Sequence, residues 1–177
     1  MPALHKDATL DAVTKHDYVD LRALADTIWR QHYAAIISAA QIDSMLSGRF
    51  NDASLGEYAH AADRWLELLR VSGMLVGYCG YELADQYGDE SLAAIKLGQL
   101  YLLESHRGMG LGRFMLSYVE SRARDLERRV LFLQVNKQNT GAIGFYAAAG
   151  FTIAREAVFD IGSGFVMDDY VMEKRLS

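Results

Sequence analysis

Residues 100–113 read LYLLESHRGMGLGR, from Leu100 to Arg113, and join two patterns of different kinds. The apolar first part predicts a strand. Gly108, Gly110 and Gly112 then predict a tight turn, because glycine adopts backbone conformations that other residues rarely reach. An amphipathic run follows the turn, so the segment as a whole predicts a strand, a turn and a helix.

The turn before this helix has the chemistry of an anion-binding site. The leading amides of a helix have no intrahelical acceptor, and the helix dipole adds partial positive charge there. The glycines lack Cβ atoms and let a phosphate approach, while Arg107 and Arg113 add charge at either end. A P-loop would require Gly-Lys-Ser/Thr, and a dinucleotide fingerprint would require a small residue at Arg113, so neither motif fits. The motif alone leaves open a glycine turn with a purely structural role.

The composition is that of a globular protein. The chain has 177 residues, of which 51% are hydrophobic and 23% charged, and this lies outside the range of disordered sequences. Such a length predicts one domain over residues 1–177. The formal net charge of −5 does not favour nucleic-acid binding, because phosphate contacts require clustered Lys and Arg. The single cysteine, Cys79, excludes an internal disulfide framework.

Targeting and metal-binding signals are absent from the sequence. No apolar run approaches the roughly 20 residues of a membrane span, and the N-terminus lacks the apolar region of a secretory signal. We therefore expect a cytoplasmic protein with neither membrane nor nucleic-acid partners. The five histidines show no ligand-like clustering, so no metal is expected.

Apolar spacing predicts the order of the elements. Three helices are expected in the first third, beginning near Asp17, Ser38 and Asn51. The expected strands are 64–71, 74–83, 92–103, 130–135, 151–158 and 165–172, and the expected later helices are 110–125 and 139–149, with turns at 72–73 and 85–90. Helices, a three-stranded meander, strand–helix alternation and a final hairpin predict an α+β fold with a mixed sheet.

A second segment follows the strand expected at 130–135. It reads NTGAIGFYAAAGF, from Asn139 to Phe151, and begins 27 residues after Gly112. With both segments in this order, the chain resembles the GCN5-related N-acetyltransferase (GNAT) superfamily over about residues 65–151. The resemblance implies a central mixed, mostly antiparallel sheet flanked by helices. It also implies that the strands at 92–103 and 130–135 splay apart and hold acetyl-CoA in the gap.

The resemblance gives each matching residue a role. The loop that wraps the CoA pyrophosphate corresponds to Arg107, Gly108, Met109, Gly110, Leu111, Gly112 and Arg113. Leu100 and Leu102 correspond to strand positions whose backbone groups pair with the pantetheine amides. Asn139 corresponds to an asparagine that hydrogen-bonds the pantetheine arm, and Ala142 belongs to the same cofactor-binding segment.

Tyr146 corresponds to the tyrosine near the thioester sulfur in this family. It follows Asn139 by seven residues, or two helical turns, so both side chains are expected on one face of the helix. A tyrosine there can donate a proton to the departing thiolate, and a backbone N–H near Leu102 can donate to the developing oxyanion. The alternative is that Tyr146 is only a core aromatic residue.

The sequence indicates the general base less clearly than it indicates the general acid, Tyr146. Related polyamine acetyltransferases carry a glutamate around the positions of Gly98 and Gln99, where this chain has no carboxylate. Glu82 is the base candidate on the preceding strand. Glu104, a water chain and an amine that is already partly deprotonated remain alternatives.

The acceptor is expected to be a primary amine. Acidic residues in the helical first third, near the turn at 85–90 and near the last strand would attract a cation, although they also fit an ordinary acidic surface. They are Asp43, Asp52, Glu57, Asp63, Asp85, Asp89, Glu90, Asp168 and Asp169. Segments 42–50, 159–162 and 168–174 are loosely similar to bacterial spermidine/spermine N-acetyltransferases, which adds polyamines to the expected acceptors. A protein amine, an amino sugar and an amino-acid amine remain open.

Two other classes of function stay open at this point. One is a non-catalytic acyl-CoA-binding regulatory module, for which the missing strand carboxylate leaves room. The other is an unrelated α+β structural protein. A homodimer is expected if the chain pairs through its terminal strands, since the last hairpin offers apolar residues.

Overall fold

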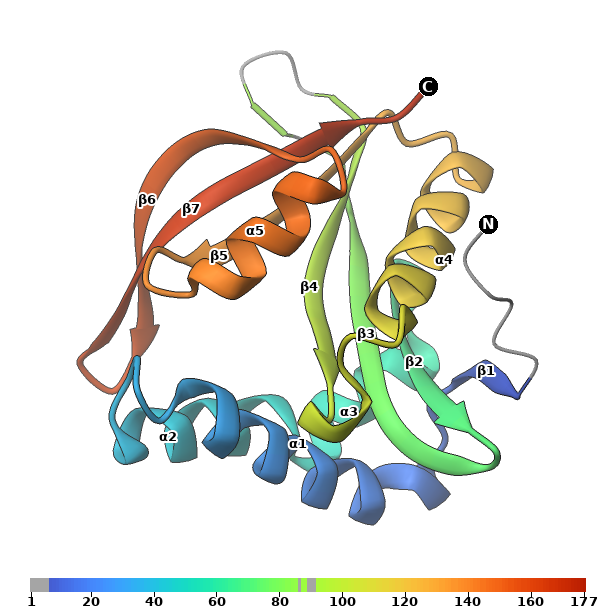
Figure 1. The fold of residues 1–177 in the computed structure, drawn as a ribbon, viewed down its shortest axis with the longest axis vertical. Coiled ribbons are helices and arrows are strands. Elements are labelled where there is room, and N and C mark those ends of the chain that lie inside the picture. Colours follow the sequence, from blue (N-terminus) through green and yellow to red (C-terminus); the bar gives the residue numbers. More distant parts are fainter. Residues whose placement is uncertain (1–6, 86, 89–91) are drawn as a thin grey trace. The chain divides into compact units, whose positions relative to one another are not determined.

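The computed structural model describes residues 7–85, 87–88 and 92–177. These residues form a seven-stranded sheet in the order β1-β2-β3-β4-β5-β7-β6 (Figure 1). The strands are β1 (Ala8–Ala12), β2 (Arg64–Val71), β3 (Met74–Ala84), β4 (Ala94–Leu102), β5 (Val130–Asn136), β6 (Thr152–Gly162) and β7 (Phe165–Arg175). The helices are α1 (Tyr18–Tyr33), α2 (Ala39–Arg49), α3 (Asp52–His60), α4 (Leu111–Asp125) and α5 (Thr140–Ala148), with 3₁₀ turns η1 (Lys15–Asp17) and η2 (Glu104–His106). The predicted α+β class is therefore confirmed.

The chain forms two compact units. The first comprises Met1–Tyr81 and Gln99–Ser117, and the second comprises Glu82–Gly98 and Tyr118–Ser177. Three elements, β3, β4 and α4, run from one unit into the other. Part of the turn expected at 85–90 falls outside the described residues, and so do Asp89 and Glu90.

The first two helices of the first unit begin in different ways. Helix α2 begins as predicted, because the Ser38 hydroxyl accepts a hydrogen bond from the Gln41 amide at 3.1 Å. Helix α1 also begins where expected, with Asp17 at the N-cap position, but the Asp17 side chain makes no capping hydrogen bond to the helix. The Asp17 carboxylate instead accepts from the Thr14 amide at 2.8 Å and pairs with Arg70 at 2.7 Å, because Asp17 closes the preceding 3₁₀ turn.

An aromatic cluster forms the centre of the first unit. Trp29 of α1 is 1% exposed, and its ring lies 5.3 Å from Tyr33 and 5.4 Å from Tyr101 of β4, between centroids. The Trp29 indole donates to the Tyr78 hydroxyl at 2.9 Å, and the hydroxyls of Tyr33 and Tyr101 are hydrogen-bonded at 2.9 Å. This cluster fixes the second half of β4 against α1. Cys79 of β3 is also fully buried, and burial raises the pKa of its thiol.

One strand of the first unit is missing from the predictions. β1 pairs antiparallel with β2 in a register from Ala8↔Val71 to Ala12↔Glu67. The five residues read ATLDA and alternate between apolar and polar side chains, but the run is short and its two alanines have low strand propensity, so the strand signal is weak. The hairpin turn predicted between β2 and β3 is confirmed, since Ser72 and Gly73 have φ values of 50° and 81°.

The second unit contains the parallel strand pair. β4 and β5 pair in parallel from Ala94↔Val130 to Leu97↔Leu133, and both strands run on past this register, which agrees with the expected splay. β5 pairs antiparallel with β7, and β7 with β6. Helix α5 ends at Ala148, one residue before the expected end at Ala149, and Gly150 follows with a φ of 93°, which is typical of a glycine after a helix C-terminus.

Candidate active site

The glycine-rich turn lies between η2 and α4 in the first unit. Gly108 and Gly110 have φ values of 74° and 83°, as the predicted tight turn requires. A Cβ atom on Gly108 would meet nothing within 4 Å, so backbone conformation explains this glycine and crowding does not. The Phe114 amide donates to the Gly110 carbonyl at 3.0 Å as the first helical bond, so the amides of Leu111 and Gly112 belong to the leading turn of α4.

The side chains around this turn are exposed to solvent, and two of them carry a positive charge. Arg107 and Arg113 are exposed, and the Met109 side chain is 56% exposed. The pKa of His32, at the end of α1, is lowered by burial and then by the charge of Arg107. Open glycines, helix amides and two guanidinium groups together fit an anionic ligand such as a diphosphate.

The strand before the turn carries the predicted pantetheine positions. Leu100 is half-buried and Leu102 is buried in β4, and the next amide, that of Leu103, donates to the Val76 carbonyl at 2.9 Å. Gly77 is required beside this segment, because a Cβ there would lie 2.6 Å from the Tyr101 carbonyl oxygen.

Gln99 of β4 occupies one of the two positions around which related polyamine acetyltransferases carry a glutamate. Its side chain is 5% exposed, and its Nε2 donates to the Tyr58 hydroxyl of α3 at 3.3 Å. Its Oε1 is buried and accepts no hydrogen bond within the described part of the chain. Gly80 leaves room for this amide, since a Cβ at that position would lie 3.2 Å from Nε2.

The predicted base candidates have ordinary surroundings. Glu82 of β3 lies in the second unit, with its side chain 38% exposed and its carboxylate 3.8 Å from the Lys96 ammonium group. Glu104 lies in η2 of the first unit and is exposed. Neither side chain is buried.

The second predicted segment begins helix α5 in the second unit. Asn139 is 7% exposed, and its Oδ1 accepts from the Ala142 amide at 3.2 Å, so it is the helix cap, as predicted. Tyr146 is 8% exposed, with its ring 5.1 Å from Phe145 and 5.5 Å from Phe151 in edge-to-face contacts. The structure therefore places Ala142 and Tyr146 on one short helix that Asn139 caps.

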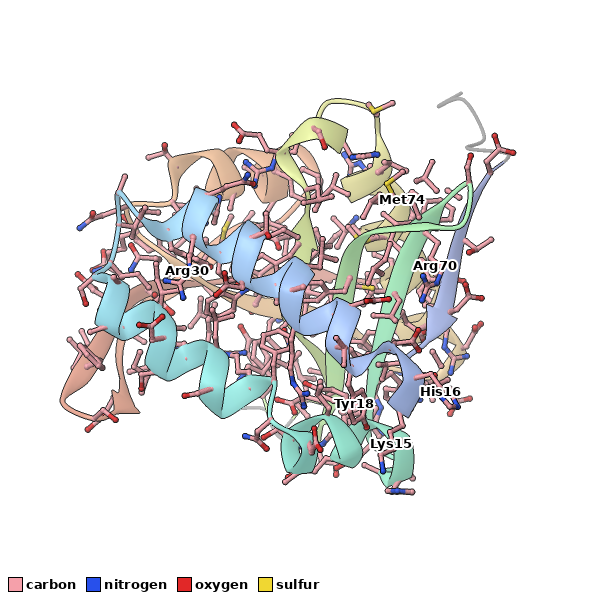
Figure 2. All side chains as sticks on the ribbon, turned by 90° about the horizontal axis from the view of Figure 1, so that it is seen from below. Lys15, His16, Tyr18, Arg30, Arg70 and Met74 are labelled. Carbon is pink, nitrogen blue, oxygen red and sulfur yellow. The ribbon has the colours of Figure 1, made fainter. Side chains whose placement is uncertain are left out.

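Most acidic residues expected to attract a cation are paired with arginines. Arg30, labelled in Figure 2, lies 2.9 Å from Asp26 and 2.6 Å from Asp43. Arg22 pairs with Asp52, Arg64 with Glu57 and Asp63, and Arg128 with Asp85. These pairs cancel much of the negative field that the sequence led us to expect in both units.

Asp168 of β7 pairs with Lys137 at 2.7 Å, whereas its neighbour Asp169 belongs to none of these ion pairs among the described residues. Asp169 is 5% exposed, and its Oδ1 is buried without a hydrogen-bond partner in the described structure. Burial and then the charge of Asp168 raise the pKa of Asp169 to about 6, although the charge of Lys137 lowers it. Sequence reasoning treated Asp169 only as acidic lining, because its burial depends on the pairing of β7 with β5 and β6.

Within the described residues, no group of three or more His, Cys, Asp or Glu side chains is arranged to hold a metal ion. Within the same residues, no helix has the length and apolar character needed to cross a bilayer.

A model of the acetyltransferase (GNAT) family matches residues 21–151, which is most of the chain. The chain belongs to the GNAT family. It is therefore an acetyl-CoA-dependent N-acetyltransferase, and the predicted family and enzyme class are confirmed. An uncharacterized N-acetyltransferase of Lactobacillus delbrueckii subsp. lactis is 25% identical over 165 residues, which are 93% of this chain and 95% of the relative. Another, of Mycobacterium bovis, is 28% identical over 160 residues, which are 90% of this chain and 98% of the relative.

Solved GNAT structures have the same fold. PaiA N-acetyltransferase of Thermoplasma acidophilum, in complex with coenzyme A, matches with a TM-score of 0.77 and 20% identity over 95% of this chain and 98% of that one. Spermidine N-acetyltransferase of Vibrio cholerae, in complex with CoA and spermine, matches with a TM-score of 0.65 and 17% identity over 96% of each chain. An Arabidopsis thaliana protein bound to the bisubstrate analogue CoA-Ac-MVNAL also has a TM-score of 0.65, with 20% identity over 95% of this chain and 98% of that one.

Proposed function

We propose that this GNAT protein transfers the acetyl group of acetyl-CoA to a primary amine by direct attack. The observation that carries the proposal is the turn at Gly108 and Gly110, whose left-handed backbone leads straight into the amides of α4. Such a turn suits a diphosphate, and CoA contains one. The family supplies the rest of the assignment, because acetyl transfer is its chemistry.

Three sets of groups on the chain would bind three parts of acetyl-CoA. The backbone amides from Gly108 to Arg113, with the charge of Arg107, would hold the diphosphate. Backbone groups of Leu100 and Leu102 would bind the pantetheine amides. Asn139, which caps α5, would bind the pantetheine arm.

The transfer step balances without a further reactant. The neutral amine nitrogen attacks the thioester carbonyl carbon, and a backbone N–H near Leu102 stabilises the oxyanion that forms. The new C–N bond remains, the C–S bond breaks, and Tyr146 gives its proton to the departing thiolate. The proton that the nitrogen loses on becoming an amide restores Tyr146 through the solvent. Tyrosine has an ordinary pKa of about 10 and a thiol about 8.5, so the transfer depends on the basicity that sulfur gains in the transition state.

The chemical class of the acceptor amine is a separate part of the proposal. Polyamines are supported by the loose similarity of three segments to spermidine/spermine acetyltransferases. The arginine pairs weaken the case, because Asp43, Asp52 and Glu57 no longer form an uncompensated acidic lining for a polycation. A protein amine and an amino sugar therefore stand beside polyamines as acceptors to be tested.

We also propose that the chain forms a homodimer through its terminal hairpin. β6 is the last strand in the sheet order, and Ile153 and Val158 on it are 49% and 67% exposed. Exposed apolar side chains on an edge strand favour pairing with another strand.

The test is an acceptor screen that measures free CoA. The panel contains spermidine, a peptide with a free N-terminus, a lysine peptide, glucosamine and an amino-acid amide, each against a no-amine control. We expect one amine class to release CoA well above that control. If no amine releases CoA while acetyl-CoA still raises the Tm by mass action, the chain is a binding module and the proposal is wrong.

A further inference from the structure

Asp169 lies at a distinctive place in the second unit. It faces Asn136 in the last pair of the β5–β7 ladder and Ala157 on the other side, in β6. Asn136 is the final residue of β5, and Asn139, which caps α5, follows it by three residues. Asp169 therefore sits beside the end of the strand that leads directly into the helix of Tyr146.

A buried carboxylate oxygen without a partner is expensive, and native structures rarely retain one without a reason. Lys137 is near enough to influence Asp169, but its ammonium group is held at 2.7 Å from Asp168 and 2.7 Å from Glu156. Oδ1 of Asp169 is therefore a hydrogen-bond acceptor that no donor among the described residues occupies.

We propose that Asp169 is the general base of the transfer reaction; this rests on the proposed function. The acceptor enters as an ammonium ion, and one N–H proton moves to Oδ1 of Asp169. The freed lone pair of the nitrogen forms the C–N bond with the acetyl carbon while the C–S bond breaks. Tyr146 remains the separate donor to sulfur, and the second proton that the nitrogen loses on becoming an amide restores Tyr146 through the solvent. Asp169 returns its own proton to water after the product leaves.

The environment of Asp169 suits this task better than those of Glu82, Asp52 and Glu57. Glu82 is partly exposed beside Lys96, and Asp52 and Glu57 are paired with arginines. The charged groups that act on Asp169 are Asp168 on its own strand and Lys137 at the end of β5, with Glu156 of β6 acting through Lys137. A pKa of about 6 leaves Asp169 ionised at neutral pH and still able to take a proton.

The experiment compares Asp169→Asn, Asp169→Glu and Asp125→Asn by kinetics between pH 5.5 and 9. Asp125 is a matched control, because it is an aspartate of the same unit with a 63% exposed side chain paired with Arg122. We expect Asp169→Asn to lower kcat by about 100-fold or more and to remove the acid limb of the pH profile near pH 6. Its acetyl-CoA Kd should match that of the wild type, and Asp169→Glu should recover part of the rate. Asp125→Asn should stay within about twofold of the wild type, as expected for an exposed charge.

Two results would overturn the inference, and they are distinguishable. An Asp169→Asn protein with wild-type kcat and pH profile removes Asp169 from catalysis and leaves the acetyl transfer intact. A wild-type protein that acetylates no amine in the screen contradicts the proposed function and this inference with it. If Asp169→Asn does not fold, Asp169→Glu decides the question, because a base role moves its acid limb and a structural role leaves the limb in place.

Discussion

Tyr146 combines a packing role with a proposed chemical role. Its ring fills the space between Phe145 and Phe151, and a phenylalanine would keep those contacts. Only the hydroxyl group is needed to protonate the thiolate. Packing and proton transfer can therefore be separated by removing one oxygen atom.

Tyr146→Phe is expected to keep the acetyl-CoA Kd and lower kcat by about 10²–10⁴-fold, the usual contribution of a general acid. Isothermal titration gives the first quantity and free-CoA kinetics the second. Tyr87→Phe makes the same change in the same unit, where the hydroxyl donates to Glu173 at 2.7 Å, and should leave kcat unchanged. Wild-type turnover in Tyr146→Phe would exclude the acid role.

Asp169→Asn is expected to raise the stability of the protein, although it is expected to lower kcat. The folded-state pKa of Asp169 is raised from 3.8 to about 6, so the folded protein binds this proton more tightly than the unfolded chain does. Stability therefore falls as the pH rises from about 4 through 6, and the full loss is present above that range. Asp169→Asn should raise the Tm at pH 8 by about 2–4 °C, as for about 1 kcal/mol, and by less at pH 4. A lower Tm at pH 8 would show that the ionised carboxylate is stabilised instead.

At the scale of elements, the turn before α4 depends on backbone conformation. Gly108→Ala places a Cβ in open space but keeps a φ of 74°, which costs a residue with a side chain about 1–2 kcal/mol. If the turn shifts to relieve this strain, the KM for acetyl-CoA should rise by about tenfold, with kcat little changed. Gly48→Ala in α2 is the control, because its Cβ also meets nothing within 4 Å and its helical backbone tolerates alanine. An unchanged KM in Gly108→Ala would contradict a role for this turn in binding.

Elements with strong local signals were predicted closely. β2 has the predicted bounds, and α4 begins one residue later than expected at Leu111, because periodic apolar residues and glycines are visible in the sequence itself. β1 was missed because its strand partner β2 is distant in the sequence. The side-chain capping role of Asp17 was wrong because its carboxylate closes the preceding 3₁₀ turn and pairs with Arg70. The glycine turn and the Asn139 cap were predictable for the same local reason. The burial of Asp169 and the arginine pairing of Asp43 exist only after the chain folds.

At the scale of the whole molecule, the proposed dimer depends on the edge strand β6. Val158→Lys places a charge on that strand, where it should block strand pairing and give a monomer by light scattering at concentrations where the wild type is a dimer. Val19→Lys is the control, because Val19 is 73% exposed but lies on α1. A dimeric Val158→Lys protein would place the interface elsewhere, and a monomeric wild type would rule out the dimer.

The burial of Cys79 has a practical consequence for all these measurements. It is the only cysteine in the chain, no part of it reaches the solvent, and its high pKa keeps the sulfur protonated. A chromogenic disulfide reagent added to the native protein therefore reads only the sulfhydryl of the released coenzyme, without background from the enzyme. Denaturation exposes one additional sulfhydryl per polypeptide, so the same absorbance reading also counts the unfolded fraction of each preparation.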